Sequence, residues 1–212
     1  MMSILAMSML AASGLSKLEP IPVAVVLTEG ATMIDFAGPW EVFQDAMVDD
    51  RAAFQLYTVS DAKAPIRTSG GMQVMPDYTF DDAPPPAIVV VGAQRGSLRM
   101  KEWLQQVAPR VKVLMSVCTG AFKLAAAGLL DGKKATTHHD FFDEFEKRFP
   151  RVSLQRGSRF VQSSATVFTA GGLTSGIDLA LHVVEVYFGR AVAERTAKYM
   201  EYEGQGWLRT SG

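Results

Sequence analysis

Cys118 is the single cysteine of this 212-residue chain, and it lies between a strand-like and a helix-like segment. The apolar run 112–117 precedes it, and the small-residue run 119–128 follows it. A side chain on such a sharp turn projects from the sheet at a helix N-terminus, where free N–H groups and the helix dipole favour a thiolate. The setting predicts a nucleophile, although a lone cysteine often serves only as a small apolar core residue.

Two further residues could work with this thiol. Asp35 stands just before a helix-like run, so its side chain is either a helix N-cap or a carboxyl group that exchanges protons with Cys118. An ionised Asp35 would raise the pKa of the thiol, and the two groups would titrate as a unit. Thr119 either caps the helix or turns its backbone N–H toward an anion that forms on a substrate, as in an oxyanion hole.

Other candidate residues lie in loops. Gly92 and Ala93 follow another apolar run, so their backbone could supply a second N–H to a substrate. His138 could act as a base toward Cys118, or it could be an ordinary loop histidine. Gly172, in a Gly-Gly pair, allows a close backbone approach and could line the same site.

Composition narrows the classes of function. The formal net charge is −1 and no basic stripe is present, so we expect a small-molecule substrate and no nucleic-acid partner. A single cysteine excludes an intramolecular disulfide. Three histidines and one cysteine without close ligand spacing predict no metal site, and nothing in the sequence calls for a cofactor.

The first 19 residues differ from the rest of the chain. Residues 1–15 are apolar and small, form a run too short to span a bilayer, and lack the basic residue that opens a signal peptide. We expect an N-terminal extension over residues 1–19, either an additional packed helix or a degenerate signal, and one domain over residues 20–205. A cytoplasmic location is favoured, although this segment leaves export or membrane tethering open.

Strand-like and helix-like segments alternate along the domain, which predicts an α/β fold with a mostly parallel sheet. In such folds the ligand crevice lies beyond the carboxyl ends of the strands, so the loops that carry Asp35, Gly92 and Cys118 should converge. The main strands are expected at residues 21–27, 54–59, 87–92 and 112–117, with a short pair at 160–162 and 167–169. The helices are expected at residues 35–46, 97–107, 119–128, 141–149, 175–188 and 191–202.

Three segments together resemble the ThiJ/PfpI superfamily, whose members share a class I glutamine amidotransferase-like domain. They are Ser-Val-Cys-Thr-Gly-Ala at residues 116–121, the Gly-Leu-Leu-Asp-Gly to Ala-Thr-Thr-His stretch at 128–138, and Thr-Ala-Gly-Gly to Gly-Ile-Asp at 169–178. The resemblance covers about residues 22–202. It implies a flavodoxin-like three-layer α/β/α sandwich, a Cys nucleophile elbow at Cys118 and a homodimer.

Two branches of the superfamily are most similar. The isonitrile hydratase branch implies a hydratase that adds water to an isocyanide, with Cys118 as nucleophile and Asp35 and Thr119 as its partners. The second branch is the ligand domain of AraC-type transcription regulators, which implies a non-catalytic ligand- or redox-sensing domain. Because the chain stops at Gly212, too early for a helix-turn-helix region, we favour the hydratase. One departure from the pattern is Gly92-Ala93 where paired glycines are usual.

Overall fold

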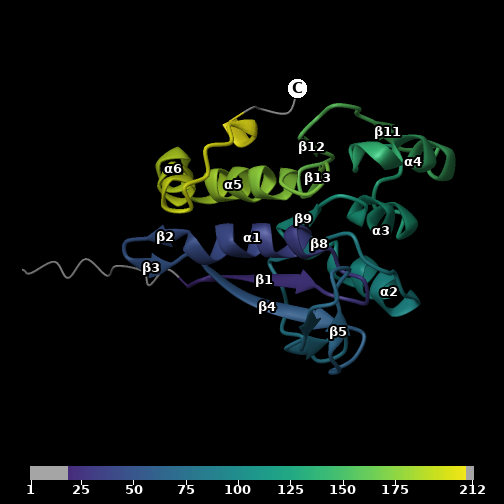
Figure 1. Cartoon of the computed structure of the whole chain (residues 1–212), viewed down its shortest axis with the longest axis horizontal. Helices are drawn as coiled ribbons and strands as arrows, with labels where there is room; N and C mark the ends of the chain where they lie inside the picture. The colour runs from purple at the N-terminus through teal and green to yellow at the C-terminus, as the bar shows by residue number, and fades with distance from the viewer. Residues whose placement is uncertain (1–18, 209–212) are drawn as a thin grey trace, which may run out of the picture.

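The computed structural model describes residues 19–208, so the extension predicted at residues 1–19 lies outside it except for residue 19. A seven-stranded sheet, in the order β12-β13-β9-β8-β1-β4-β7, forms the centre of the molecule (Figure 1). Only β12 runs antiparallel to its neighbour. No helix within the described range is long and apolar enough to cross a membrane.

The central strands arise from the continuous apolar runs of the sequence, as parallel strands buried on both faces require. They are β1 (Ile21–Val26), β4 (Phe54–Ser60), β8 (Ile88–Val91), β9 (Val113–Ser116) and β13 (Val167–Ala170). Val91 lies opposite Val26 on one side and Ser116 on the other. The three strands β1, β8 and β9 therefore end at the same level, and the loops that follow them meet at one edge.

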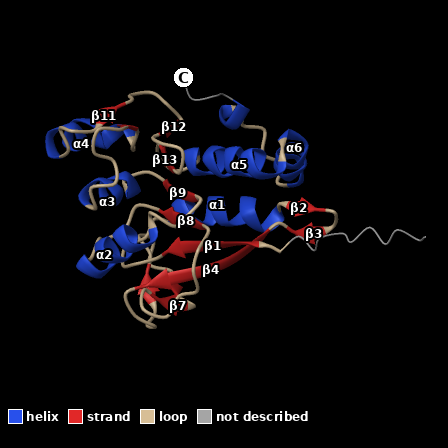
Figure 2. Cartoon of the chain, turned by 180° about the vertical axis from the view of Figure 1, so that it is seen from behind, coloured by secondary structure: helices blue, strands red, loops and turns tan. Residues whose placement is uncertain are grey.

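Helices cover both faces of the sheet, as the two opposite views show (Figures 1 and 2). One core contains residues of α1 (Met33–Asp45), α5 (Ser175–Phe188) and α6 (Arg190–Tyr199), and the other those of α2 (Leu98–Val107), α3 (Gly120–Ala126) and α4 (Phe142–Arg148). Successive residues of a strand place their side chains in opposite cores, because side chains alternate between the two faces of the sheet. The predicted flavodoxin-like three-layer α/β/α sandwich is confirmed.

Several short elements were not predicted, because two-residue strands and single helical turns carry no periodic pattern. They are β2 (Met47–Val48), β3 (Arg51–Ala52), β5 (Ile66–Arg67), β7 (Tyr78–Thr79), β10 (Lys134–Ala135), β11 (Ser153–Leu154), η1 (His139–Phe141) and η2 (Gly206–Leu208). The strand β6 (Gln73–Val74) lies within residues 72–77, where the sequence after a Gly-Gly turn does predict a short strand. The predicted pair at residues 160–162 and 167–169 is present as β12 (Phe160–Gln162) and β13.

A buried carboxylate fastens the C-terminal segment to α5. Asp178 is 1% exposed and accepts hydrogen bonds from Arg159 Nε at 2.7 Å, from the Tyr202 hydroxyl at 3.1 Å and from the Trp207 N–H at 3.1 Å. These bonds satisfy a charge that would otherwise be costly to bury. The chain after α6 is thereby held against the layer that carries α1 and the candidate site.

Candidate active site

Cys118 sits on a strained turn between β9 and α3. Its φ is +57°, in the left-handed region that a residue with a side chain seldom adopts, at a cost of roughly 1–3 kcal/mol. Two contacts hold it there: its N–H donates to the Gly171 carbonyl at 2.8 Å, and its carbonyl accepts from the Thr137 hydroxyl at 2.9 Å. A Cβ at Gly120 would lie 2.0 Å from the Val91 carbonyl oxygen, so the turn also requires glycine there. The strand-to-helix elbow is present as predicted.

Asp35 is fully buried in the first turn of α1 and does not cap that helix. The N-cap position belongs to Thr32, and Asp35 Oδ2 instead accepts a hydrogen bond from the Ala93 N–H at 2.9 Å. The other oxygen, Oδ1, is buried and has no regular hydrogen-bond partner among residues 19–208. The N-cap interpretation is therefore wrong, and the carboxyl group is directed into the site.

Burial raises the pKa of Asp35 to about 6, because a charged carboxylate is poorly solvated there. The Ala93 N–H, the Cys118 thiol and the Leu173 N–H all lie close enough to act in the opposite direction, but burial has the larger effect. A carboxyl group whose pKa is close to neutral can both accept and return a proton. Asp35 thus has the character of a general acid–base beside Cys118.

The Cys118 thiol has a raised pKa, about 12, chiefly because it is buried and next because the Asp35 charge opposes a thiolate. Backbone N–H groups of Thr119 and Leu173 face the sulfur and lower the pKa, but less strongly. The expectation that the helix N-terminus would favour a thiolate is wrong here. The α3 helix has only seven residues, and the cysteine is 6% exposed, so desolvation prevails. At neutral pH the shared proton rests on sulfur.

The predicted oxyanion residues are all at the site, with different contacts. Thr119 occupies the N-cap position of α3 without a side-chain cap, and its N–H faces the sulfur. The Ala93 N–H is bound to Asp35, so it orients the carboxylate. Glycine is needed at position 92 so that this loop can lie close to Asp35, since a Cβ on Gly92 would lie 2.8 Å from Asp35 Cβ. The roles of these residues toward a substrate remain predictions.

Leu173 is a site residue that the sequence did not reveal. Its φ is +53°, and this left-handed conformation directs its N–H at both Cys118 and Asp35. A leucine has no sequence signal for such a backbone, and only the preceding Gly171-Gly172 pair indicated a close approach. The loop after β13 therefore joins the loops after β1, β8 and β9 at the site.

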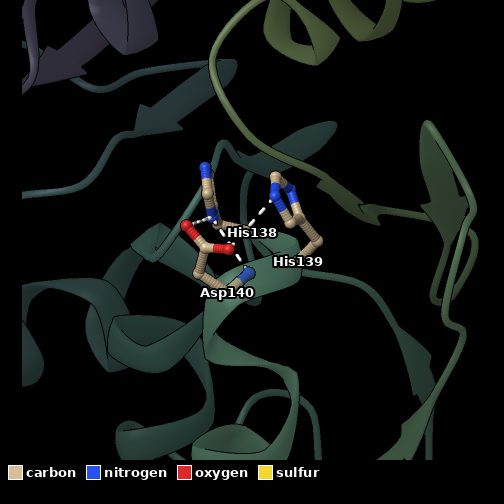
Figure 3. A group of neighbouring side chains, drawn as sticks. All are labelled: His138, His139 and Asp140. Carbon is tan, nitrogen blue, oxygen red and sulfur yellow. Dashed lines mark hydrogen bonds and ion pairs between the residues drawn. The ribbon is translucent and has the colours of Figure 1, made fainter.

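His138 borders the site but makes no hydrogen bond to Cys118. Its ring packs on Gly172, where a Cβ would lie 2.2 Å from His138 Cδ2. Its Nδ1 accepts from the Asp140 N–H at 3.2 Å (Figure 3). His138, Gly172 and Leu173 line a cavity of about 350 Å³ beside the elbow. This arrangement does not place the histidine to take the thiol proton, and its contact with a substrate stays a prediction.

Three donor groups near this cavity lie within 4.8 Å of one another: His138, His139 and Asp140 (Figure 3). The two imidazole rings are stacked, with centroids 4.5 Å apart and planes 22° from parallel. A metal ion binds in the plane of each imidazole, so rings stacked in this way do not direct their lone pairs at one point. Binding would require one ring to turn, and the Asp140 N–H already occupies His138 Nδ1.

A flavodoxin-like sandwich with a cysteine at the β9–α3 elbow and a buried acid in the first turn of α1 defines the class of this protein. Residues 22–186 match the model of the DJ-1/PfpI family, and the chain belongs to that family.

Relatives within the family have different functions. The chain is 31% identical to an isonitrile hydratase of Pseudomonas putida, over 86% of this chain and 78% of that protein. It is 30% identical to the HTH-type transcriptional regulator GbdR of Pseudomonas aeruginosa, over 87% of this chain but only 52% of the regulator, about half of its length. A ThiJ/PfpI family protein from Pseudomonas syringae has a similar solved structure, with a TM-score of 0.75, 25% identity, and coverage of 94% of this chain and 83% of that one.

Proposed function

We propose that this protein is a cysteine-dependent hydratase that adds water to an isocyanide, R–N≡C, and releases the N-substituted formamide, R–NH–CHO. The observation that carries the proposal is the burial of the Asp35 carboxylate beside the Cys118 thiol. A thiol and a carboxylate in contact can move one proton back and forth without solvent, which both halves of such a reaction require.

The first half-reaction forms a covalent intermediate. Asp35 accepts the thiol proton while Cys118 Sγ bonds to the terminal carbon of R–N≡C. The same carboxylic acid then delivers the proton to that carbon, which gives the thioimidate R–N=CH–S–Cys118. Because the proton only changes place within the pair, the thiol does not need a low pKa before the substrate binds.

The second half-reaction adds water. Asp35 takes a proton from a water molecule while the water oxygen bonds to the thioimidate carbon. Asp35 then passes this proton to the nitrogen, which gives R–NH–CH(OH)–S–Cys118. The carbon–sulfur bond then breaks, the hydroxyl proton returns to sulfur through Asp35, and the formamide leaves. The Thr119 and Leu173 N–H groups stabilise the sulfur as its negative charge develops.

The test is turnover of n-butyl isocyanide by the purified chain, with N-butylformamide measured by chromatography and mass spectrometry. We expect formation of the formamide by the natural chain and none by Cys118→Ala or Cys118→Ser, with unchanged circular dichroism. Rapid quenching should trap a protein mass increased by one isocyanide, absent from Cys118→Ala. Undiminished turnover in Cys118→Ala would rule out the covalent mechanism.

A second candidate function is ligand or redox sensing, as expected for a relative of the regulator ligand domains. The raised pKa of Cys118 favours reversible ligand binding within this alternative, because a buried neutral thiol is a weak nucleophile at rest and is slow to oxidise. If this alternative holds, no isocyanide is hydrated at any pH. The same preparation would then bind a small molecule reversibly, or convert Cys118 to a sulfenic acid under peroxide, in mass spectra.

A homodimer accompanies either proposal. Met33, Ile34 and Leu173 are apolar side chains with 40%, 36% and 42% exposure, and they flank Asp35 and Cys118 at the surface. Apolar side chains grouped in this way often mark a protein–protein contact. Light scattering should give twice the 23.0 kDa chain mass, and a single-chain mass would contradict the prediction.

A further inference from the structure

A cavity of about 520 Å³ lies among α2, α3 and α4. Thr119 forms part of its wall, whereas Cys118 and Asp35 do not. The cavity is therefore a neighbour of the candidate active site and distinct from the smaller hollow beside His138. Nothing in the proposed hydration reaction uses it, which raises the question of what it holds.

The charges around this cavity are unbalanced. Lys101, Lys123 and Arg148 line it together with one carboxylate, Glu144. Glu144 Oε1 is paired with Arg148 Nη1 at 2.9 Å, and within residues 19–208 neither lysine forms an ion pair. Two positive charges thus lack an anionic partner at one hollow in the surface.

Lys123 is the most informative of these groups because it is half-buried. Its stem runs beside Gly96, where a Cβ would lie 3.3 Å from Lys123 Cδ, so the absence of a side chain at position 96 leaves room for the lysine stem. Burial, and next the charge of Arg148, lower the pKa of Lys123. An ammonium group that loses hydration beside another cation is destabilised unless an anion joins it.

Two further features favour an anion with an apolar body. The N-terminus of the ten-residue helix α2 opens into the same cavity through Gly96 and Ser97, and its dipole adds positive potential. The opposite wall includes Phe122 and the 39% exposed Phe141. The Arg148 guanidinium lies over the ring of the buried Phe122, 5.2 Å from its centre, so this cationic group is held in place at the wall of the cavity.

We infer that this cavity binds a small organic anion, a carboxylate or a phosphate ester, with its charged group between Lys123 and Arg148 and its apolar part on the exposed ring of Phe141. The anion is either a group of the substrate itself, reaching past Thr119, or a separate ligand. Both sources share the same chemistry.

Calorimetric titration of the full chain with phenyl phosphate and benzoate tests the inference. We expect saturable binding of both anions and no binding of neutral benzamide. The affinity for the anions should fall at least tenfold in Lys123→Gln and should be retained in Lys123→Arg. Lys147→Gln, an exposed position on α4 outside the cavity, is the matched control and should bind like the natural chain. Equal affinity of Lys123→Gln and the natural chain, or equal binding of benzamide, would overturn the inference.

The source of the anion is decided by the kinetics of isocyanide hydration. Competitive inhibition by phenyl phosphate identifies a substrate subsite, and simultaneous binding of inhibitor and isocyanide identifies a separate ligand. Binding to the Cys118→Ala variant needs no turnover. The anion site therefore stands or fails independently of the hydratase proposal.

Discussion

Asp35 and Gly92 touch each other across the ends of β1 and β8, so closely that a methyl group on Gly92 would lie 2.8 Å from Asp35 Cβ. The neighbouring Ala93 N–H holds the Asp35 carboxylate at 2.9 Å. Position 92 therefore sets the distance between the start of α1 and the loop after β8, and with it the direction of the carboxylate toward Cys118.

Gly92→Ala should impair function more than a typical surface change. The added methyl group must displace Asp35 or α1, so we expect a loss of about 1–3 kcal/mol in unfolding free energy and at least a tenfold lower kcat/KM. Urea denaturation and formamide production measure the two effects. Gly70→Ala is the matched control, because no atom lies within 4 Å of a Cβ built there, and both quantities should stay close to the natural values.

Asp35→Asn should stabilise the fold while it abolishes turnover. The pKa of Asp35 is raised from 3.8 to about 6, so the folded state binds the proton more tightly than the unfolded chain does. The stability from this proton is complete below about pH 4 and is lost as the pH rises through about 6. We expect the free energy of unfolding of the variant to exceed that of the natural chain by about 2–3 kcal/mol at pH 8 and by little at pH 4.

Urea denaturation at pH 4, 5, 6 and 8 checks this pH dependence. Glu102→Gln is the control, because it removes an exposed carboxylate on α2. Its difference in unfolding free energy from the natural chain should not grow with pH. A difference between Asp35→Asn and the natural chain that stays constant across this range would contradict the raised pKa of Asp35.

Asp35→Asn should also lower the pKa of the Cys118 thiol, since the Asp35 charge is second only to burial in raising it. Thiolate absorbance near 240 nm, with Cys118→Ala as the blank for tyrosine ionisation, follows the titration. The natural chain should show almost no thiolate up to pH 10, and the variant should show it at lower pH. Identical titrations of the two chains would mean that the carboxylate and the thiol are not coupled.

The sequence predicted the layers better than the chemistry of the site. Continuous apolar runs such as Ile88–Val91 indicate buried parallel strands without knowledge of their neighbours, because burial on both faces determines their composition. The meeting of Asp35 with Cys118 was expected from strand-end geometry and from the family resemblance. The protonation state was not, because it depends on how deeply the sulfur is buried, and a pattern of residue types does not encode that depth.

The backbone conformation of Leu173 is a second feature that residue types do not encode. The Leu173 N–H reaches the site with a φ of +53°, in a β13–α5 loop that is bound to the elbow by the hydrogen bond from the Cys118 N–H to the Gly171 carbonyl. Local propensity opposes it, since leucine disfavours the left-handed region. Residues held against their propensity by tertiary contacts cannot be predicted from residue type alone, and they gather at functional sites.

The pH dependence of kcat/KM distinguishes proton exchange within the pair from simple attack by a free thiolate. If Asp35 must be ionised to accept the thiol proton, kcat/KM rises through an apparent pKa of about 6 and then reaches a plateau. If the reaction instead required a thiolate formed in solution equilibrium, the rate would keep increasing toward the thiol pKa of about 12. The proposed mechanism requires the plateau between pH 7 and 9, and a tenfold rise per pH unit over that interval would refute it. Initial rates of N-butylformamide formation at constant ionic strength measure the profile.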